Sequence, residues 1–130
     1  MIREDLIMGT SVVESLPTTV VAGGGDNGVA VDFSLRYAVK HIIHVEAITT
    51  TITVKLQHSD SSGSGYVDVP ADKMLGDVNL VTILDTADNS AVQIGGFDLK
   101  RFQRIVTVSG AGTIHAVAVR ADSFGVGAGA

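Results

Sequence analysis

Apolar and polar residues alternate along several stretches of this chain, and a period of two is typical of β-strands. The clearest stretch is Thr51–His58, in which Ile52, Val54 and Leu56 point to one side and polar residues point to the other. We expect the apolar side, and Leu56 in particular, to belong to the core. The same pattern predicts further short strands at Thr10–Glu14, Thr18–Ala22, Val29–Phe33, Tyr66–Val69, Val78–Leu84 and Ala91–Ile94. A longer strand is predicted at Val39–Ile48, which is apolar on both sides in its middle.

Two further alternating stretches predict a hairpin near the C-terminal end. Phe102–Ser109 and Thr113–Ala121 are separated by Gly110-Ala111-Gly112, and glycine accepts the positive φ angles that tight turns require. The second of these strands is apolar on both sides, with Val117 and Val119 opposite a row of isoleucine and alanine. Because such a strand is usually covered on both sides, the two valines are candidate residues of an oligomer interface. The alternative is that the small alanines of this strand tolerate solvent.

The stretch Gly23–Gly28 reads GGGDNG and matches the G-x-G-x-x-G spacing of a dinucleotide-binding loop. That loop functions only where a helix follows it, because the pyrophosphate sits on the helix N-terminus. Val29–Phe33 alternates as a strand does, so we interpret the glycines as a turn that joins Thr18–Ala22 to Val29–Phe33. No nucleotide or other cofactor is expected.

Composition agrees with short strands and tight turns: 45% of the 130 residues are hydrophobic and only 5% aromatic, with 15 glycines and 2 prolines. One short helical turn is predicted at Ala71–Leu75, after a proline and before a glycine. The predicted fold is therefore all-β, an antiparallel, jelly-roll-like β-sandwich. It occupies residues 10–122, between an N-terminal arm at 1–9 and a flexible glycine-rich tail at 123–130.

The predicted arm contains apolar residues without the periodicity or cap that would bury them within the subunit. Such a segment orders against a partner, for example by adding a strand to an exposed sheet edge. An ordinary first strand of the sandwich is the alternative. The candidate contact residues of the arm are Ile2, Leu6, Ile7 and Met8.

Charge and composition exclude several classes of protein. The net charge of −5 and the pI near 5.1 argue against nucleic acid as a partner. No apolar run approaches the roughly 20 residues that span a bilayer, and the charged N-terminus does not resemble a signal peptide. We therefore expect synthesis in the cytoplasm and no membrane contact. Absence of cysteine excludes disulfides and thiolate chemistry.

No catalytic or metal-binding group of residues emerges from the sequence. His41 and His44 lie an odd number of residues apart on one predicted strand and so face opposite sides. His58 and Asp60 could share a metal ion, but no spacing supplies the third protein ligand that zinc normally needs. We therefore expect no metal site, no catalytic residues and no enzyme activity.

Lys100, Arg101 and Arg104 form the only basic cluster, with Phe102 among them. A single cluster on an acidic chain more often forms ion pairs or meets an acidic protein surface than binds nucleic acid. These three residues are a possible charged contact patch.

The stretch KLQHSDSSGSGYVDVPADKMLG resembles small tailed-bacteriophage proteins that decorate or cement the capsid. It contains the family's strand with L-Q-x-S-D, a glycine/serine loop, an aromatic residue, D-V and a short helical turn ending in glycine. Further on, Gly95-Gly96, Lys100-Arg101 and the alanine/valine strand Ile114–Arg120 also follow the family's order. The resemblance covers roughly residues 28–121, and Phe102 departs from it where tyrosine is expected.

The resemblance implies a non-catalytic structural protein on the capsid surface of the virion. Its partners would be the major capsid protein and further copies of itself, with a trimer favoured over a dimer. The alternative is another virion structural or adhesive module that binds carbohydrate or a receptor. That alternative needs exposed aromatic residues as a platform, and the chain has no Trp, 2 Tyr and 4 Phe.

Overall fold

The computed structural model describes residues 10–33, 36–86 and 89–122, so the predicted arm and tail lie outside the described residues. Within these ranges the chain is all-β with antiparallel pairing, as predicted. One 3₁₀ turn, η1 (Ala71–Lys73), lies where the helical turn was expected. The strands are β1 (Thr10–Ala22), β2 (Val31–Asp32), β3 (Arg36–Ser59), β4 (Val67–Asp68), β5 (Val81–Ile83), β6 (Ala91–Phe97) and β7 (Phe102–Asp122).

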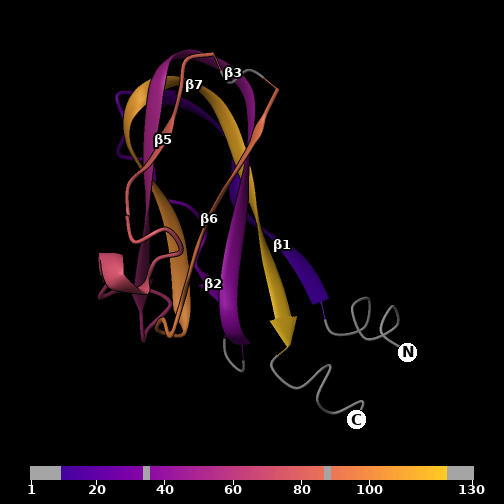
Figure 1. Cartoon of the computed structure of the whole chain (residues 1–130), viewed down its shortest axis with the longest axis vertical. Helices are drawn as coiled ribbons and strands as arrows, with labels where there is room; N and C mark the ends of the chain where they lie inside the picture. The colour runs from indigo at the N-terminus through magenta and orange to yellow at the C-terminus, as the bar shows by residue number, and fades with distance from the viewer. Residues whose placement is uncertain (1–9, 34–35, 87–88, 123–130) are drawn as a thin grey trace.

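Two long strands, β3 and β7, form the frame of the molecule. They pair antiparallel along their whole lengths, from Arg36 opposite Asp122 to Ser59 opposite Phe102. Register shifts interrupt this pairing between Val45 and Val54, and irregularities of this kind bend strands. Figure 1 shows both strands arching over one end of the molecule at this bend. The arch folds one continuous sheet into the two layers of a sandwich.

Each layer is completed by shorter strands beside this frame. In the first layer, residues 36–48 of β3 and 112–122 of β7 are flanked by β6 and β1. In the second, residues 52–59 of β3 and 102–109 of β7 are flanked by β4, β5 and β2. The core between the layers contains Ile43 and Ile114 from the first, and Ile52, Leu56 and Ile105 from the second. The predicted core position of Leu56 is confirmed.

The predicted hairpin between Phe102–Ser109 and Thr113–Ala121 is wrong. These stretches are the two halves of β7, and each half pairs with β3 rather than with the other half. Gly110 does adopt a positive φ of +105°, but it serves the bend of a continuing strand instead of a chain reversal. A side chain at Gly110 would also collide with the backbone of Thr51 and Ile52 in the neighbouring strand β3.

The predicted turn that joins Thr18–Ala22 to Val29–Phe33 does not bring these two strands together as neighbours, because the glycine segment continues along β7. The amides of Gly23, Gly25 and Gly28 donate to carbonyls of β7 at 2.8, 2.8 and 2.6 Å. β1 and β2 therefore both pair with β7 and not with each other. The structure agrees with the sequence on one point, since a strand and not a helix follows the glycines.

Two predicted breaks in strands prove to be irregularities within longer strands. Thr10–Glu14 and Thr18–Ala22 belong to one strand, β1, whose register shifts on either side of Leu16. Pro17 is tolerated there because β1 lies at the edge of the sheet and, among the described strands, pairs only with β7. Likewise, Val39–Ile48 and Thr51–His58 are both parts of β3.

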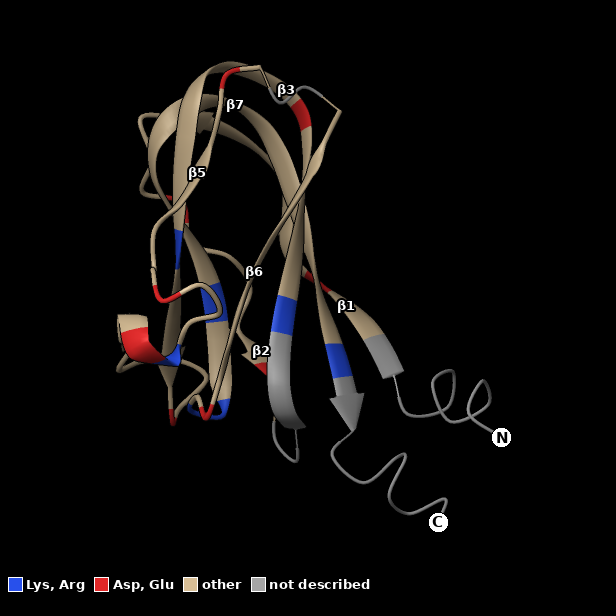
Figure 2. Ribbon diagram, in the orientation of Figure 1, with Lys and Arg blue, Asp and Glu red and all other residues tan. Residues whose placement is uncertain are grey.

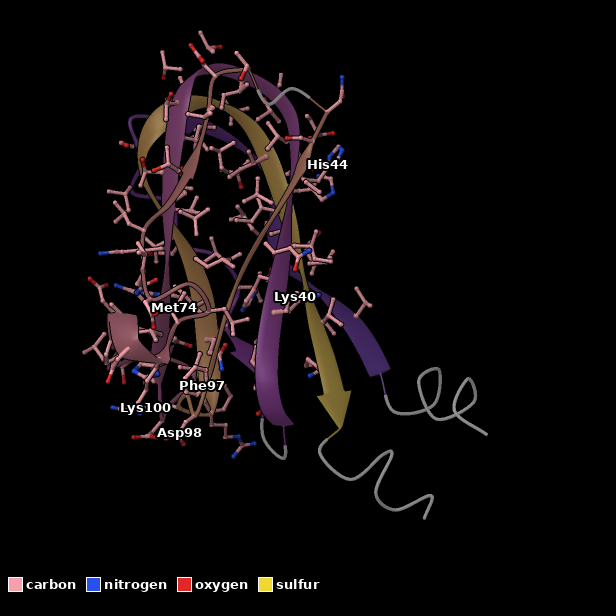
Figure 3. The ribbon with its side chains drawn as sticks, viewed as in Figure 1. Lys40, His44, Met74, Phe97, Asp98 and Lys100 are labelled. Carbon is pink, nitrogen blue, oxygen red and sulfur yellow. The ribbon has the colours of Figure 1, made fainter. Side chains whose placement is uncertain are left out.

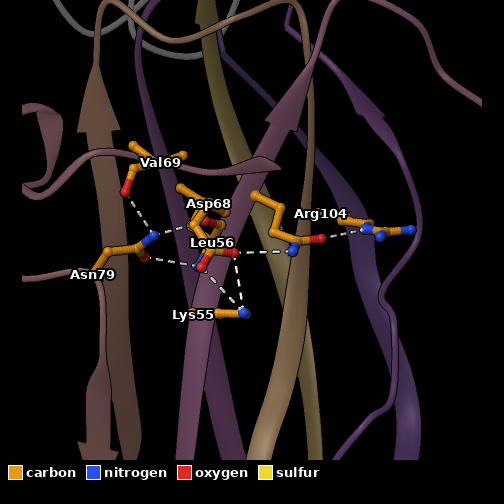
Figure 4. A network of polar contacts seen from close by, with 7 residues as sticks. Lys55, Leu56, Asp68, Val69, Asn79 and Arg104 are labelled. Carbon is orange, nitrogen blue, oxygen red and sulfur yellow. Dashed lines mark hydrogen bonds and ion pairs between the residues drawn. The ribbon is translucent and has the colours of Figure 1, made fainter. Parts of the chain in front are cut away.

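The side chain of Asn79 attaches the segment around β4 to the backbone of β3 (Figure 4). Its Nδ2 donates to the carbonyls of Leu56 and Val69 at 2.9 and 2.8 Å, and its Oδ1 accepts from the Leu56 amide at 2.9 Å. One amide side chain thus bonds to three backbone groups, of which the Leu56 carbonyl also accepts from the amide of Val69 at 3.1 Å. Within the described ranges, no helix has the length and apolar content needed to cross a bilayer.

Replacing Asn79 by alanine is expected to lower the free energy of unfolding by about 2–3 kcal/mol, because partly buried backbone groups lose their partners. Urea denaturation followed by circular dichroism measures this loss. Asn89→Ala serves as the control, since no hydrogen bond of that side chain is described. The φ of +57° at Asn89 favours asparagine over alanine, so this variant should lose a small amount of stability itself. Equal losses in the two variants would contradict the role of Asn79.

Candidate functional site

The outer side of the first layer carries an apolar surface made by three adjacent strands. Register places Val12 of β1 beside Val119 of β7, and Val117 of β7 beside Ile42 of β3. Cross-strand partners point to the same side of a sheet. Val12 is 61% exposed and the other three are partly exposed. We call these four residues the outer apolar face.

This surface contains the two valines that the sequence singled out. Ala116 and Ala118 are fully buried, so the intervening Val117 and Val119 point away from the core. Two charges border the apolar residues: Lys40 is paired with Val119, and Glu14 with Val117. The resulting surface combines apolar contact area with one charge of each sign.

Each residue of the basic cluster has a different partner within the subunit. Arg101 forms a bidentate pair with Asp32, with both bonds at 2.9 Å. Lys100 lies 3.9 Å from a carboxylate oxygen of Asp60. Figure 2 shows basic and acidic residues interspersed over the described ribbon, without a continuous basic stripe.

Arg104, the third basic residue, belongs to a polar network on the outer side of the second layer (Figure 4). Its Nε donates to Gln57 at 3.0 Å, and its guanidinium lies 4.2 Å from the ring centre of Tyr66. Gln57 and Lys55 in turn donate to Asp68 at 3.0 and 3.2 Å. These two hydrogen bonds hold the pKa of the Asp68 carboxyl below its usual value. The five residues form a pre-ordered polar surface, here called the polar face.

Two of the four histidines are buried within the subunit. His41 is buried against Phe33, with ring centres 5.6 Å apart, and burial lowers its pKa to about 4, which keeps it neutral. Nδ1 of His58 accepts a hydrogen bond from the Lys100 amide at 3.2 Å. Burial, and then the charge of Lys100, lower the pKa of His58. His41 and His44 face opposite sides of β3, as expected, and Figure 3 shows His44 on the side away from the interior.

The other two histidines lie side by side on the outer side of the first layer. His44 of β3 is the direct register partner of His115 of β7, and their ring centres are 4.9 Å apart. Glu46 lies next to them, with Oε2 4.0 Å from Nδ1 of His115. Sequence reasoning missed this pair because it compared His44 only with His41 on its own strand. Among the described residues, no group of three or more His, Asp or Glu side chains is placed to enclose a metal ion.

The candidate arm contacts Ile2, Leu6, Ile7 and Met8 lie outside the described residues. The described residues offer three candidate functional surfaces: the outer apolar face, the polar face and the histidine pair.

Comparison with known proteins identifies a fold but no family. No protein-family model matches this chain, and no curated protein matches it. Among solved structures, it is similar to the SPBc2 prophage-derived protein YomS, with a TM-score of 0.56 and 13% identity over 85% of this chain and 91% of YomS. Weaker similarities include a Bacillus endospore appendage protein (TM-score 0.49, 10% identity, 87% and 88% covered) and the module CsCBM6-3 from Clostridium stercorarium, solved with cellobiose (0.42, 13%, 88% and 83%). The fold shared with YomS agrees with the β-sandwich described above.

Proposed function

We propose that this protein is a non-catalytic capsid decoration protein of a tailed bacteriophage. In this proposal it binds the outer surface of the assembled shell and associates with copies of itself through the outer apolar face. The observation that carries the proposal is that face: Val12, Ile42, Val117 and Val119 lie together on a rigid sheet and point away from the core. The resemblance in KLQHSDSSGSGYVDVPADKMLG supplies the shell as the partner and favours a trimer over a dimer.

The chemistry of the outer apolar face suits contact with another protein surface. Apolar area supplies the favourable free energy of association, and Lys40 and Glu14 at its border balance in charge. A symmetric oligomer repeats each contact with the shell, so modest contacts combine into firm attachment. A decoration protein needs no further chemistry than this.

A second function, adhesion to a carbohydrate or receptor, is favoured by the polar face. The ring of Tyr66 lies beside the hydrogen-bonding groups of Gln57, Asp68 and Arg104, and aromatic rings next to polar groups are common in binding sites. Only one aromatic ring belongs to this network, so it offers a small stacking surface. Glycan binding that Tyr66→Ala abolishes, without any binding to shells, would favour this second function.

Replacing Val117 by aspartate is expected to dissociate the oligomer without unfolding the subunit. A carboxylate cannot be buried in an apolar interface without a partner, whereas Val117 is only partly buried in the isolated subunit. Native mass from light scattering, measured at several concentrations, tests this. Val20→Asp is the matched control, because Val20 is 75% exposed and lies outside the outer apolar face.

The shell contact is tested by co-sedimentation with undecorated shells assembled from the phage's major coat protein. We expect the wild type and Val20→Asp to saturate the shells at a fixed ratio to coat protein. Val117→Asp should bind at least about tenfold more weakly, a loss of about 1.4 kcal/mol or more, because it binds as single subunits. Failure of the wild type to sediment with shells would overturn the capsid function. A wild-type mass equal to one chain would overturn the interface.

A further inference from the structure

We propose that His44 and His115 form a binding site for one divalent transition-metal ion, such as Zn²⁺, Ni²⁺ or Cu²⁺. The two histidines come from neighbouring strands and are direct partners in the register of β3 and β7. Neither shell attachment nor self-association is needed for this site, so it stands independently of the proposed function.

The spacing of the two rings fits a shared metal ion. An imidazole nitrogen binds zinc at about 2.0–2.1 Å, which places the ring centre about 3.2 Å from the metal. Two such ligands at a tetrahedral angle have ring centres about 5.2 Å apart, and at a right angle about 4.5 Å apart. The observed separation of 4.9 Å lies between these values. The separation of the two ring centres thus matches the separation that one shared metal ion requires.

Glu46 provides the carboxylate that often accompanies a metal-binding histidine. Its Oε2 is 4.0 Å from Nδ1 of His115, and this Nδ1 is buried with no hydrogen-bond partner in the structure. A small side-chain rotation would let Nδ1–H donate to Glu46, which leaves Nε2 as the free lone pair. Carboxylates that fix the tautomer and orientation of a ligating histidine in this way raise metal affinity.

The other histidines do not offer this arrangement. His41 is buried in the core, and Nδ1 of His58 already accepts the backbone hydrogen bond from Lys100. In contrast, the His115 side chain is 37% exposed and His44 is partly exposed, so an ion can reach them from solvent. With two protein nitrogens, the remaining coordination positions are filled by water. Imidazole ligands favour zinc, nickel and copper over magnesium, which prefers oxygen.

Isothermal titration calorimetry of the tag-free full-length chain tests the site with ZnCl₂, NiCl₂ and MgCl₂ as separate titrants. We expect one Zn²⁺ or Ni²⁺ per chain and no Mg²⁺. His44→Gln and His115→Gln should each weaken Zn²⁺ binding by at least about 10–100-fold. That is the loss observed when a residue that hydrogen-bonds to a metal ligand is removed, and removing the ligand itself should cost no less. His58→Asn is the matched control, since it also removes one histidine while asparagine keeps an acceptor for the Lys100 amide.

Circular dichroism of each variant confirms that the fold is intact. A second measurement uses the wild type alone: on addition of Zn²⁺, the imidazole NMR signals of His44 and His115 should shift before those of the other histidines. The proposal is overturned if Zn²⁺ binding is unchanged in both His44→Gln and His115→Gln, or if His58→Asn alone abolishes it. It is equally overturned if the wild type binds neither Zn²⁺ nor Ni²⁺.

Discussion

Replacing Leu56 by alanine is expected to lower the free energy of unfolding by about 2–5 kcal/mol. Leu56 is 0% exposed and lies in the core cluster to which both layers contribute. Truncation to alanine removes buried methyl groups and leaves a cavity that strands held by hydrogen bonds on both sides cannot close. Urea denaturation, with the slope of the transition compared between variants, measures the loss.

Leu84→Ala is the matched control, because the same side chain is shortened where it is 61% exposed, directly after β5. Its effect should stay within about 0.5 kcal/mol, as for most surface substitutions. A loss below about 0.5 kcal/mol for Leu56→Ala would place this side chain outside the core. The stacking of the two layers would then be wrong.

Replacing Gly110 by alanine is expected to cost about 3 kcal/mol or more. The φ of +105° at this position is one that side chains rarely adopt, and a Cβ would lie 2.6 Å from Cα of Ile52. Two costs therefore add, the backbone strain at Gly110 and the displacement of the neighbouring backbone of β3. Because both strands bend here, displacement at this point would disturb the pairing of the two layers. Urea denaturation is again the measurement.

Gly63→Ala provides the comparison, because no atom lies within 4 Å of its added Cβ and its φ is not in the unusual positive range. We expect that variant to keep the stability of the wild type within about 0.5 kcal/mol. If Gly110→Ala unfolds at the same urea concentration as Gly63→Ala, the close approach of β3 to Gly110 at the bend is not present in solution.

The location of strands and the division of their residues between two sides could be predicted from sequence. Alternation is a local property of the extended backbone, so Leu56 could be assigned to the core before its neighbours were known. In the same way, Val117 and Val119 could be assigned to the side of the strand opposite Ala116. The alternation of apolar and polar residues thus determined that the chain forms a β-sandwich with an apolar outer strand.

Which segments pair with each other was decided only by the tertiary structure. A glycine such as Gly110 permits a tight turn and a strand bend equally well, because both need a positive φ. The choice depends on whether a long partner strand is available, and β3 is that partner. The predicted hairpin at Gly110 failed for this reason, whereas the predicted turn at GGGDNG failed because β1 and β2 both pair with β7.

The composition of the candidate sites also depends on which distant segments pair with each other. His44 and His115 share no sequence motif, and only the register between β3 and β7 brings their rings to 4.9 Å. Likewise, Arg104 was grouped with Lys100 by sequence, whereas the fold places it with Gln57 and Tyr66. The sequence by itself determined the strands and their two sides. The partners of each side depend on contacts between distant segments, which form only when the two layers pack together.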